Sequence, residues 1–193
     1  MIGTGRRQRK LELGRELNLT GNGGDIPVVR APISLLALVL LAGACGHPTF
    51  PASSPHPLLG QPLPAIHHRQ TLAGQPFDGA QLAGRPVLIK FFAEYCKPCQ
   101  VTLPGAERVH EDHPEVRILG IDEDESSETA GALVQRYGLT FPVIHDDGNV
   151  LSGRFHVSAM PMTFMADASG VVRWVGGEGQ TEADLRRAVE AAE

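Results

Sequence analysis

Apolar and polar positions alternate along residues 64–193 in a pattern that predicts an α/β fold. Residues 86–93, PVLIKFFA, are apolar except for Lys90, which is typical of a strand buried on both faces of a sheet. Residues 96–113 follow as a predicted helix. We therefore expect a central strand over residues 87–93 that leads directly into a helix.

The other predicted elements continue this alternation of short strands and helices. They are, in chain order, a hairpin of residues 66–69 and 75–78, a strand at 116–121, a helix at 126–137, a strand around 143–144, a helical turn near Leu151, strands at 163–166 and 171–175, and a last helix within 181–192. Strands that alternate with helices predict a three-layer sandwich, in which helices flank a mixed central sheet. The hairpin is expected to extend this sandwich at its N-terminal side.

The first 45 residues have a different pattern, which predicts an export signal. Six basic residues precede an uncharged, Leu-rich run at 31–44. That run has 14 residues, whereas a membrane-spanning helix needs about 20. A basic segment followed by a short apolar segment and small residues is typical of a secretory signal. We expect residues 1–45 to be a signal peptide.

Residues 41–45, LAGAC, resemble the lipobox of bacterial lipoproteins, in which a signal peptidase cuts before a lipidated cysteine. The resemblance implies a lipid on Cys45; an uncleaved signal anchor and ordinary cleavage are the alternatives. Residues 46–63 contain five prolines and predict a stiff tether, so the folded domain is expected at 64–193. These features predict an exported lipoprotein that is anchored to the membrane and faces the periplasm or the cell exterior.

Composition and charge exclude several classes of function. The chain has 193 residues, 42% of them hydrophobic and 20% charged, which favours one compact domain over a disordered chain. Its net charge is −5, and residues 45–193 alone carry −8. An acidic body lacks the basic surface that binds phosphate backbones, so we expect no nucleic-acid partner.

The cysteines indicate where the chemistry lies. The chain has three, and with Cys45 set aside as a lipid site, Cys96 and Cys99 form a lone C-x-x-C motif. A disulfide-rich scaffold needs several pairs, and a structural zinc site usually needs a second pair of ligands. Haem attachment requires a His directly after the second cysteine, where this chain has Gln100. In an exported protein, a lone C-x-x-C between a strand and a helix is typical of redox chemistry.

The predicted start of the helix explains why this pair would react. Cys96 lies where unpaired backbone N–H groups and the positive end of the helix dipole stabilise a thiolate. Lys97 adds a positive charge beside it, and Pro98 suits the first helical turn because it lacks an N–H. Cys99, one turn further, can attack a mixed disulfide at Cys96 and release the partner. This chemistry requires no cofactor.

Residues 87–100, VLIKFFAEYCKPCQ, resemble the active-site strand and helix start of the thioredoxin superfamily. Further segments resemble its membrane-anchored TlpA/ResA branch: LAGRP at 82–86, FPVIHDDG at 141–148, VSAMPMTF at 157–164 and DASGV at 167–171. The resemblance covers about residues 64–188. It implies a thioredoxin-like fold and an envelope thiol-disulfide oxidoreductase, favoured in the reductase direction, that exchanges disulfides with the thiols of protein partners. We expect a monomer.

The resemblance also assigns an environment to the cysteine pair. Tyr95, which stands where the family usually has Trp, and Glu94 would lie beside the first cysteine. Met160 and Pro161 would form a loop with a cis peptide bond, and the Met160 backbone would pair with an extended substrate strand. Peroxiredoxins have a Thr three residues before the reactive cysteine, where this chain has Ala93.

Lys90 is the main departure from the family pattern. It lies six residues before Cys96, where thioredoxins often have a buried acid that relays a proton to the resolving cysteine. The simplest expectation is that the Lys90 side chain extends along the sheet to solvent. The alternative is that its charge stabilises thiolates and makes the protein a stronger oxidant. The branch also commonly has a Glu where this chain has Thr102, so the route of the proton and the redox potential stay open.

A disulfide oxidase and a thiol-based copper carrier are the alternative functions on the same fold. His110 and His113 are three residues apart, but a His near a helix C-terminus is favoured by the dipole, so we expect no metal site. Met162 and Met165 would lie on opposite faces of a strand, which favours core packing over a shared metal. The acidic run at 122–125 lacks the pattern of a calcium loop and predicts a solvated turn.

Overall fold

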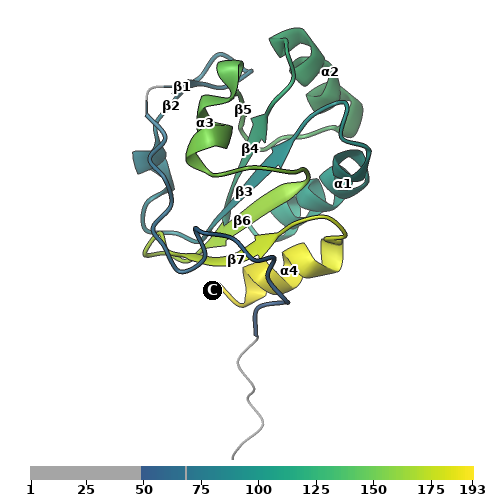
Figure 1. Cartoon of the computed structure of the whole chain (residues 1–193). Coiled ribbons are helices and arrows are strands. Elements are labelled where there is room, and N and C mark those ends of the chain that lie inside the picture. Colours follow the sequence, from purple (N-terminus) through teal and green to yellow (C-terminus); the bar gives the residue numbers. More distant parts are fainter. Residues whose placement is uncertain (1–48, 68) are drawn as a thin grey trace, which may run out of the picture. The chain divides into compact units, whose positions relative to one another are not determined.

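A five-stranded mixed sheet forms the centre of the computed structural model, which describes residues 49–67 and 69–193 (Figure 1). The strands are β3 (Val87–Phe92), β4 (Arg117–Asp122), β5 (Val143–His145), β6 (Met162–Ala166) and β7 (Val172–Gly176), in the spatial order β5-β4-β3-β6-β7. β3, β4 and β5 are parallel, whereas β6 and β7 run antiparallel to their neighbours. β3 is therefore the central strand, as its continuous apolar run predicts.

The helices begin and end at residues suited to those positions. They are α1 (Lys97–Asp112), α2 (Ser127–Tyr137), α3 (Val150–Arg154) and α4 (Glu182–Glu190), with 3-10 turns η2 (Gly79–Leu82) and η3 (Asp147–Asn149). Ser126 caps α2 by accepting a hydrogen bond from the Thr129 N–H, and Gly138 ends that helix with a φ of 61°. Thr181 and Asp184 form a reciprocal capping box at the start of α4.

Two apolar clusters fill the spaces between the sheet and its covering layers. On one face, Leu88 and Phe92 of β3 pack with residues of α1 and α4 and with Leu133 of α2. On the other face, Ile89 packs with Leu151 of α3 and with residues from the N-terminal part of the domain. The three-layer sandwich with a mixed central sheet is therefore confirmed (Figure 1).

The N-terminal hairpin is present, but it is shorter than predicted and shifted along the chain. β1 (Arg69–Gln70) pairs antiparallel with β2 (Pro76–Phe77), whereas the pattern predicted strands at 66–69 and 75–78. Ile66 is instead buried in the apolar cluster on the α3 side of the sheet, and its C=O accepts a hydrogen bond from the Gly79 N–H at 2.7 Å. Ile66 therefore packs in the main core and does not pair in the small sheet.

The segment predicted as a tether, residues 46–63, lies against the edge strand β7 in its described part. The Ser54 N–H donates to the Val175 C=O at 2.7 Å, and the Gly60 N–H donates to the Val172 C=O at 2.8 Å. The indole N–H of buried Trp174 donates to the Ala52 C=O at 3.1 Å. The packed part of the protein thus begins before residue 64, because this segment satisfies backbone groups that an edge strand leaves unpaired.

The signal peptide predicted at 1–45 and the lipid site predicted at Cys45 lie outside the described residues. In the part of the chain that the structure describes, no helix is both long and apolar enough to cross a membrane.

Candidate active site

The two cysteines lie where β3 leads into α1. Cys96 is the N-cap of α1, and its Sγ accepts a hydrogen bond from the Cys99 N–H at 3.1 Å. A disulfide bond joins the two sulfurs, with an S–S distance of 1.98 Å and a Cα–Cα distance of 5.2 Å. Pro98 lies in the first turn of the helix. The C-x-x-C motif thus forms the N-terminal turn of a helix, where a thiolate at Cys96 faces the positive end of the dipole.

The two sulfurs differ in their access to solvent. Cys96 is 5% exposed, and Cys99 is completely buried. Tyr95, Lys97 and Pro98 are exposed next to Cys96, and Tyr95 is 64% exposed. A sulfur of a partner protein can therefore approach Cys96 and not Cys99.

The loop before β6 contains the two residues expected to meet a substrate strand. Met160 is half-buried and packs against both apolar clusters, one of which contains the two cysteines. The Met160–Pro161 peptide bond is cis, as the family resemblance implies. Met162 and Met165 are buried in the two opposite apolar clusters, which confirms that they are core residues.

The backbone N–H and C=O of Glu94 are each held by a side chain to which the sequence pattern assigned no role at the site. The Glu94 N–H donates to both carboxylate oxygens of Asp124, at 3.0 and 3.1 Å. The Glu94 C=O accepts from the side-chain amide of Gln100 at 2.5 Å, and the Oε1 of Gln100 accepts from the Tyr137 hydroxyl at 3.2 Å. Of the three residues that hold Glu94 directly or through Gln100, only Gln100, which follows the motif directly, could have been indicated by proximity in sequence.

Lys90 does not extend to solvent, so that expectation is wrong. Its side chain is completely buried, and its Nζ has no hydrogen-bond partner among the described residues. Lys90 lies between Leu88 and Phe92 on the face of β3 that packs against the cysteine-containing cluster. Burial lowers the pKa of Lys90 from 10.5 to about 7. The covering helices leave the ammonium no path to water, which the strand pattern alone does not reveal.

The acidic run at 122–125 is also more buried than a solvated turn. Asp122 is completely buried and Asp124 is 8% exposed. The Asp122 Oδ1 accepts from the Asp124 N–H at 3.0 Å and lies 3.4 Å from the His145 Nδ1, while its Oδ2 has no partner among the described residues. Burial raises the pKa of Asp122 to about 8. Burial and the negative charges of Glu123, Asp124 and Asp122 raise the pKa of Tyr95, so these acids act electrostatically on the residue beside Cys96.

Among the described residues, potential metal ligands do not gather around the cysteines. Among the described residues, the one group of three such ligands is His113, Glu115 and Glu193, near the C-terminal end of α1. Both carboxylates lie within hydrogen-bond distance of the same Nδ1 of His113, at 2.9 and 3.2 Å. Hydrogen bonds to this ring nitrogen account for the grouping. In this part of the chain, no such group includes Cys96 or Cys99.

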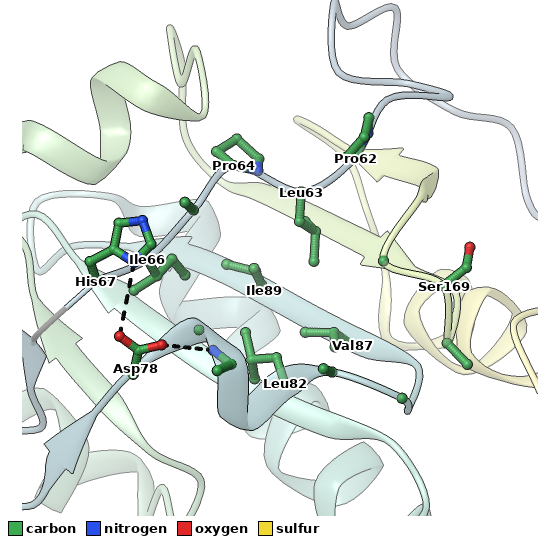
Figure 2. A pocket seen from close by; sticks show the side chains of 17 residues that line it. Pro62, Leu63, Pro64, Ile66, His67, Asp78, Leu82, Val87, Ile89 and Ser169 are labelled. Carbon is green, nitrogen blue, oxygen red and sulfur yellow. Dashed lines mark hydrogen bonds and ion pairs between the residues drawn. The ribbon is translucent and has the colours of Figure 1, made fainter.

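A cavity of about 390 Å³ lies away from the cysteines, at the beginning of β3 (Figure 2). Its walls come from the extended segment that includes Leu63 and Ile66, from η2 with Leu82, and from Val87 and Ile89 of β3. This lining is largely apolar and contains no cysteine, so we do not assign the redox chemistry to it.

Comparisons with known proteins agree with this site. Residues 59–175 match the model of the AhpC/TSA family. The chain is 31% identical over 157 residues to "Thiol-disulfide oxidoreductase ResA" of Bacillus thuringiensis (strain Al Hakam), which covers 78% of this chain and 90% of that protein.

Two solved structures extend the comparison to the fold. A secreted disulfide oxidoreductase of Mycobacterium tuberculosis superposes with a TM-score of 0.60 at 27% identity, covering 64% of this chain and 94% of that chain. A thioredoxin family thiol:disulfide interchange protein of Chlorobium tepidum TLS superposes with a TM-score of 0.63 at 26% identity, covering 74% and 99%. The chain therefore belongs to the AhpC/TSA family and has the thioredoxin-like fold and redox-active cysteine pair of the thiol-disulfide oxidoreductases to which it is similar.

Proposed function

We propose that this protein is an exported thiol-disulfide oxidoreductase that reduces disulfides of other proteins in the cell envelope. The observation that carries the proposal is the disulfide between Cys96, which is 5% exposed at the N-cap of α1, and Cys99, which is completely buried one turn away. One sulfur can meet a partner, and the other is protected until the partner is bound. This division of roles is what disulfide exchange through a mixed intermediate requires.

The reaction follows from this asymmetry. In the reduced protein, the Cys96 thiolate attacks one sulfur of the partner's disulfide, and the other partner sulfur leaves as a thiolate. Cys99 then gives up its proton and attacks the Cys96 Sγ, so the Cys96–Cys99 disulfide forms and the second partner sulfur is released. Two electrons have passed from this protein to its partner. A reductant in the envelope, itself a dithiol, must restore the Cys96 and Cys99 thiols.

Charges near the pair bear on the direction of the reaction. Burial and the acids at 122–124 raise the pKa of Tyr95 next to Cys96, and at neutral pH the negative charges of Glu123 and Asp124 disfavour a thiolate on Cys96. A less stable thiolate favours the disulfide form and makes the protein a reductant. Lys97 and a protonated Lys90 act in the opposite sense, which is the argument for the oxidase alternative.

An insulin-reduction assay tests the function. The Cys96→Ser variant is expected to be inactive, because it lacks the accessible nucleophile. The Cys99→Ser variant is expected to accumulate a mixed disulfide that a non-reducing gel resolves. Cys45→Ser is the matched control, since it removes the one cysteine outside the motif, and it should keep the activity of the unmodified protein. Full activity of Cys96→Ser would refute the proposal.

The equilibrium with glutathione tests the direction. We expect a reduction potential of about −270 mV, the value of a thioredoxin-like reductant. A potential of about −120 mV would be that of a strong oxidant. It would contradict the reductase direction and favour a disulfide oxidase.

We further propose that the mature protein is a monomeric lipoprotein attached to the membrane through Cys45. The supporting observations are the LAGAC sequence at 41–45 and the secreted nature of the Mycobacterium tuberculosis protein to which the fold is similar. In cell fractionation, the protein should be found with membranes, and Cys45→Ser should move it to the soluble fraction, whereas Cys96→Ser should not. Membrane association of Cys45→Ser equal to that of the unmodified protein would contradict the lipid anchor.

A further inference from the structure

The loop between β3 and α1 determines where the reactive sulfur lies. Only Ala93, Glu94 and Tyr95 separate the end of β3 from Cys96. Two consecutive Cα–Cα steps of about 3.8 Å connect Glu94 to Cys96, so displacement of the Glu94 peptide moves the sulfur relative to the helix N-terminus. Within this loop, Glu94 is the residue whose N–H and C=O are both held by side chains from other elements.

We propose that Asp124 is a positioning residue for disulfide exchange: its carboxylate, which holds the Glu94 N–H, keeps Cys96 at the N-terminus of α1. Asp124 lies 30 residues from Glu94 in the sequence and reaches it from the turn after β4. Both of its carboxylate oxygens lie within hydrogen-bond distance of the same N–H. The residue touches neither sulfur, so it acts through the loop.

Asp124 is itself held in place by its surroundings. Its side chain is 8% exposed, and its own N–H donates to the buried carboxyl of Asp122. The neighbouring Glu123 N–H donates to the C=O of Phe92, the last residue of β3, at 3.0 Å. The turn after β4 is therefore fixed to the end of β3 by backbone as well as side-chain hydrogen bonds. Through its bond to the Glu94 N–H, Asp124 fixes the active-site loop relative to this turn.

Two effects of Asp124 can be separated by substitution. Asp124→Asn removes the negative charge but keeps an oxygen that accepts from the Glu94 N–H. Asp124→Ala removes both the charge and the acceptor. The difference between the two variants thus reports on the hydrogen bond, and the difference between Asp124→Asn and the unmodified protein reports on the charge.

The expected results differ for the two effects. Loss of the acceptor leaves a half-buried N–H unpaired, and we expect Asp124→Ala to exchange disulfides about tenfold more slowly than Asp124→Asn at neutral pH. Loss of the charge favours the Cys96 thiolate, and we expect both variants to shift the equilibrium with glutathione about three- to tenfold toward the reduced protein. The rate of Cys96 alkylation as a function of pH gives the thiolate population directly and should show a lower midpoint for Asp124→Asn.

A matched control is available in another turn. Asp167, in the turn between β6 and β7, accepts hydrogen bonds from the N–H groups of Ser169 and Val171, at 2.9 and 3.2 Å. It follows Ala166, which pairs with Val87 at the beginning of β3, far from the cysteines. Asp167→Ala therefore removes a turn carboxylate of the same kind and should leave the exchange rate unchanged.

Other titratable groups around the turn of Asp124 should be followed in the same experiment. They are the adjacent Glu123, Asp122, which accepts from the Asp124 N–H and lies 3.4 Å from His145 of β5, and Glu94, whose side chain lies 3.9 Å from Arg136. Gln100→Met removes the bond to the Glu94 C=O while Asp124 stays intact, and it should also slow exchange if the position of the peptide matters. The proposal is overturned if Asp124→Ala and Asp124→Asn exchange at the same rate, or if Asp167→Ala slows exchange as much as Asp124→Ala does.

Discussion

Replacing Lys90 by methionine removes a buried amine that has no hydrogen-bond partner among the described residues. Methionine has a similar length and an apolar, flexible side chain, so it can occupy the same space in the cluster beside α1. The substitution therefore tests whether the structure is destabilised by the charge that this position can carry. The test is carried out on the oxidised protein, in which neither cysteine titrates.

The magnitude follows from the pKa. Burial lowers the pKa of Lys90 from 10.5 to about 7. At about 1.4 kcal/mol per pKa unit, this fall corresponds to about 5 kcal/mol against the charged form in the folded protein. Since the side chain can shift and admit water, we treat this as an upper bound and expect Lys90→Met to raise the free energy of unfolding at pH 6 by about 2–4 kcal/mol.

The sign of the pH dependence is defined by the same pKa values. Between pH 7 and pH 10.5 the unfolded chain binds the Lys90 proton more tightly than the folded protein does, so the free energy of unfolding rises with pH. The penalty is complete below pH 7 and absent above pH 10.5. Lys90→Met should remove this rise, so the difference between the two proteins should shrink as the pH increases across this window.

Urea denaturation at pH 6, 7.5 and 9, followed by the fluorescence of buried Trp174, measures the effect. Lys97→Met is the matched control, because Lys97 is exposed and its removal should change stability little. If Lys90→Met were no more stable than the unmodified protein at pH 6, or if the two had the same pH dependence, the conclusion that a charged amine is buried without compensation would be refuted.

Three further predictions concern other parts of the fold. Asp122→Asn should stabilise the protein above pH 8 and have little effect near pH 4, because burial raises the pKa of Asp122 to about 8 and its ionisation then opposes folding; urea denaturation at both pH values measures this. Gly120→Ala should lower the free energy of unfolding by about 1–3 kcal/mol, since a Cβ there would lie 2.9 Å from the Phe92 ring, and denaturation of the variant checks it. A protein that begins at residue 64 should unfold at a lower temperature than one that begins at residue 49, because it loses the hydrogen bond between Ala52 and Trp174; equal melting temperatures would show that the segment along β7 contributes nothing.

Much of the fold could be predicted because it depends on neighbours in the sequence. The apolar run of β3 is long enough to require burial on both faces, and the residues that cap α2 and α4 act within one helical turn. The hairpin was placed less well, since Ile66 could pair in a small sheet or enter the main core, and burial in the larger cluster prevailed. The local sequence pattern does not show which of the two environments of Ile66 is more stable.

The cysteine pair was evident from the sequence because its geometry is local: three residues in the first turn of a helix bring the sulfurs together and place Cys96 at the dipole. The residues that surround the pair were decided by the tertiary structure. Whether Lys90 is buried depends on the helices that cover its face of the sheet, and Asp124 reaches Glu94 across 30 residues. Trp174 and Ala52 are 122 residues apart. Burial and long-range hydrogen bonds depend on which surfaces meet after folding. Residue types and spacings therefore determined which cysteine is the nucleophile, while packing determined the charges and hydrogen bonds around it.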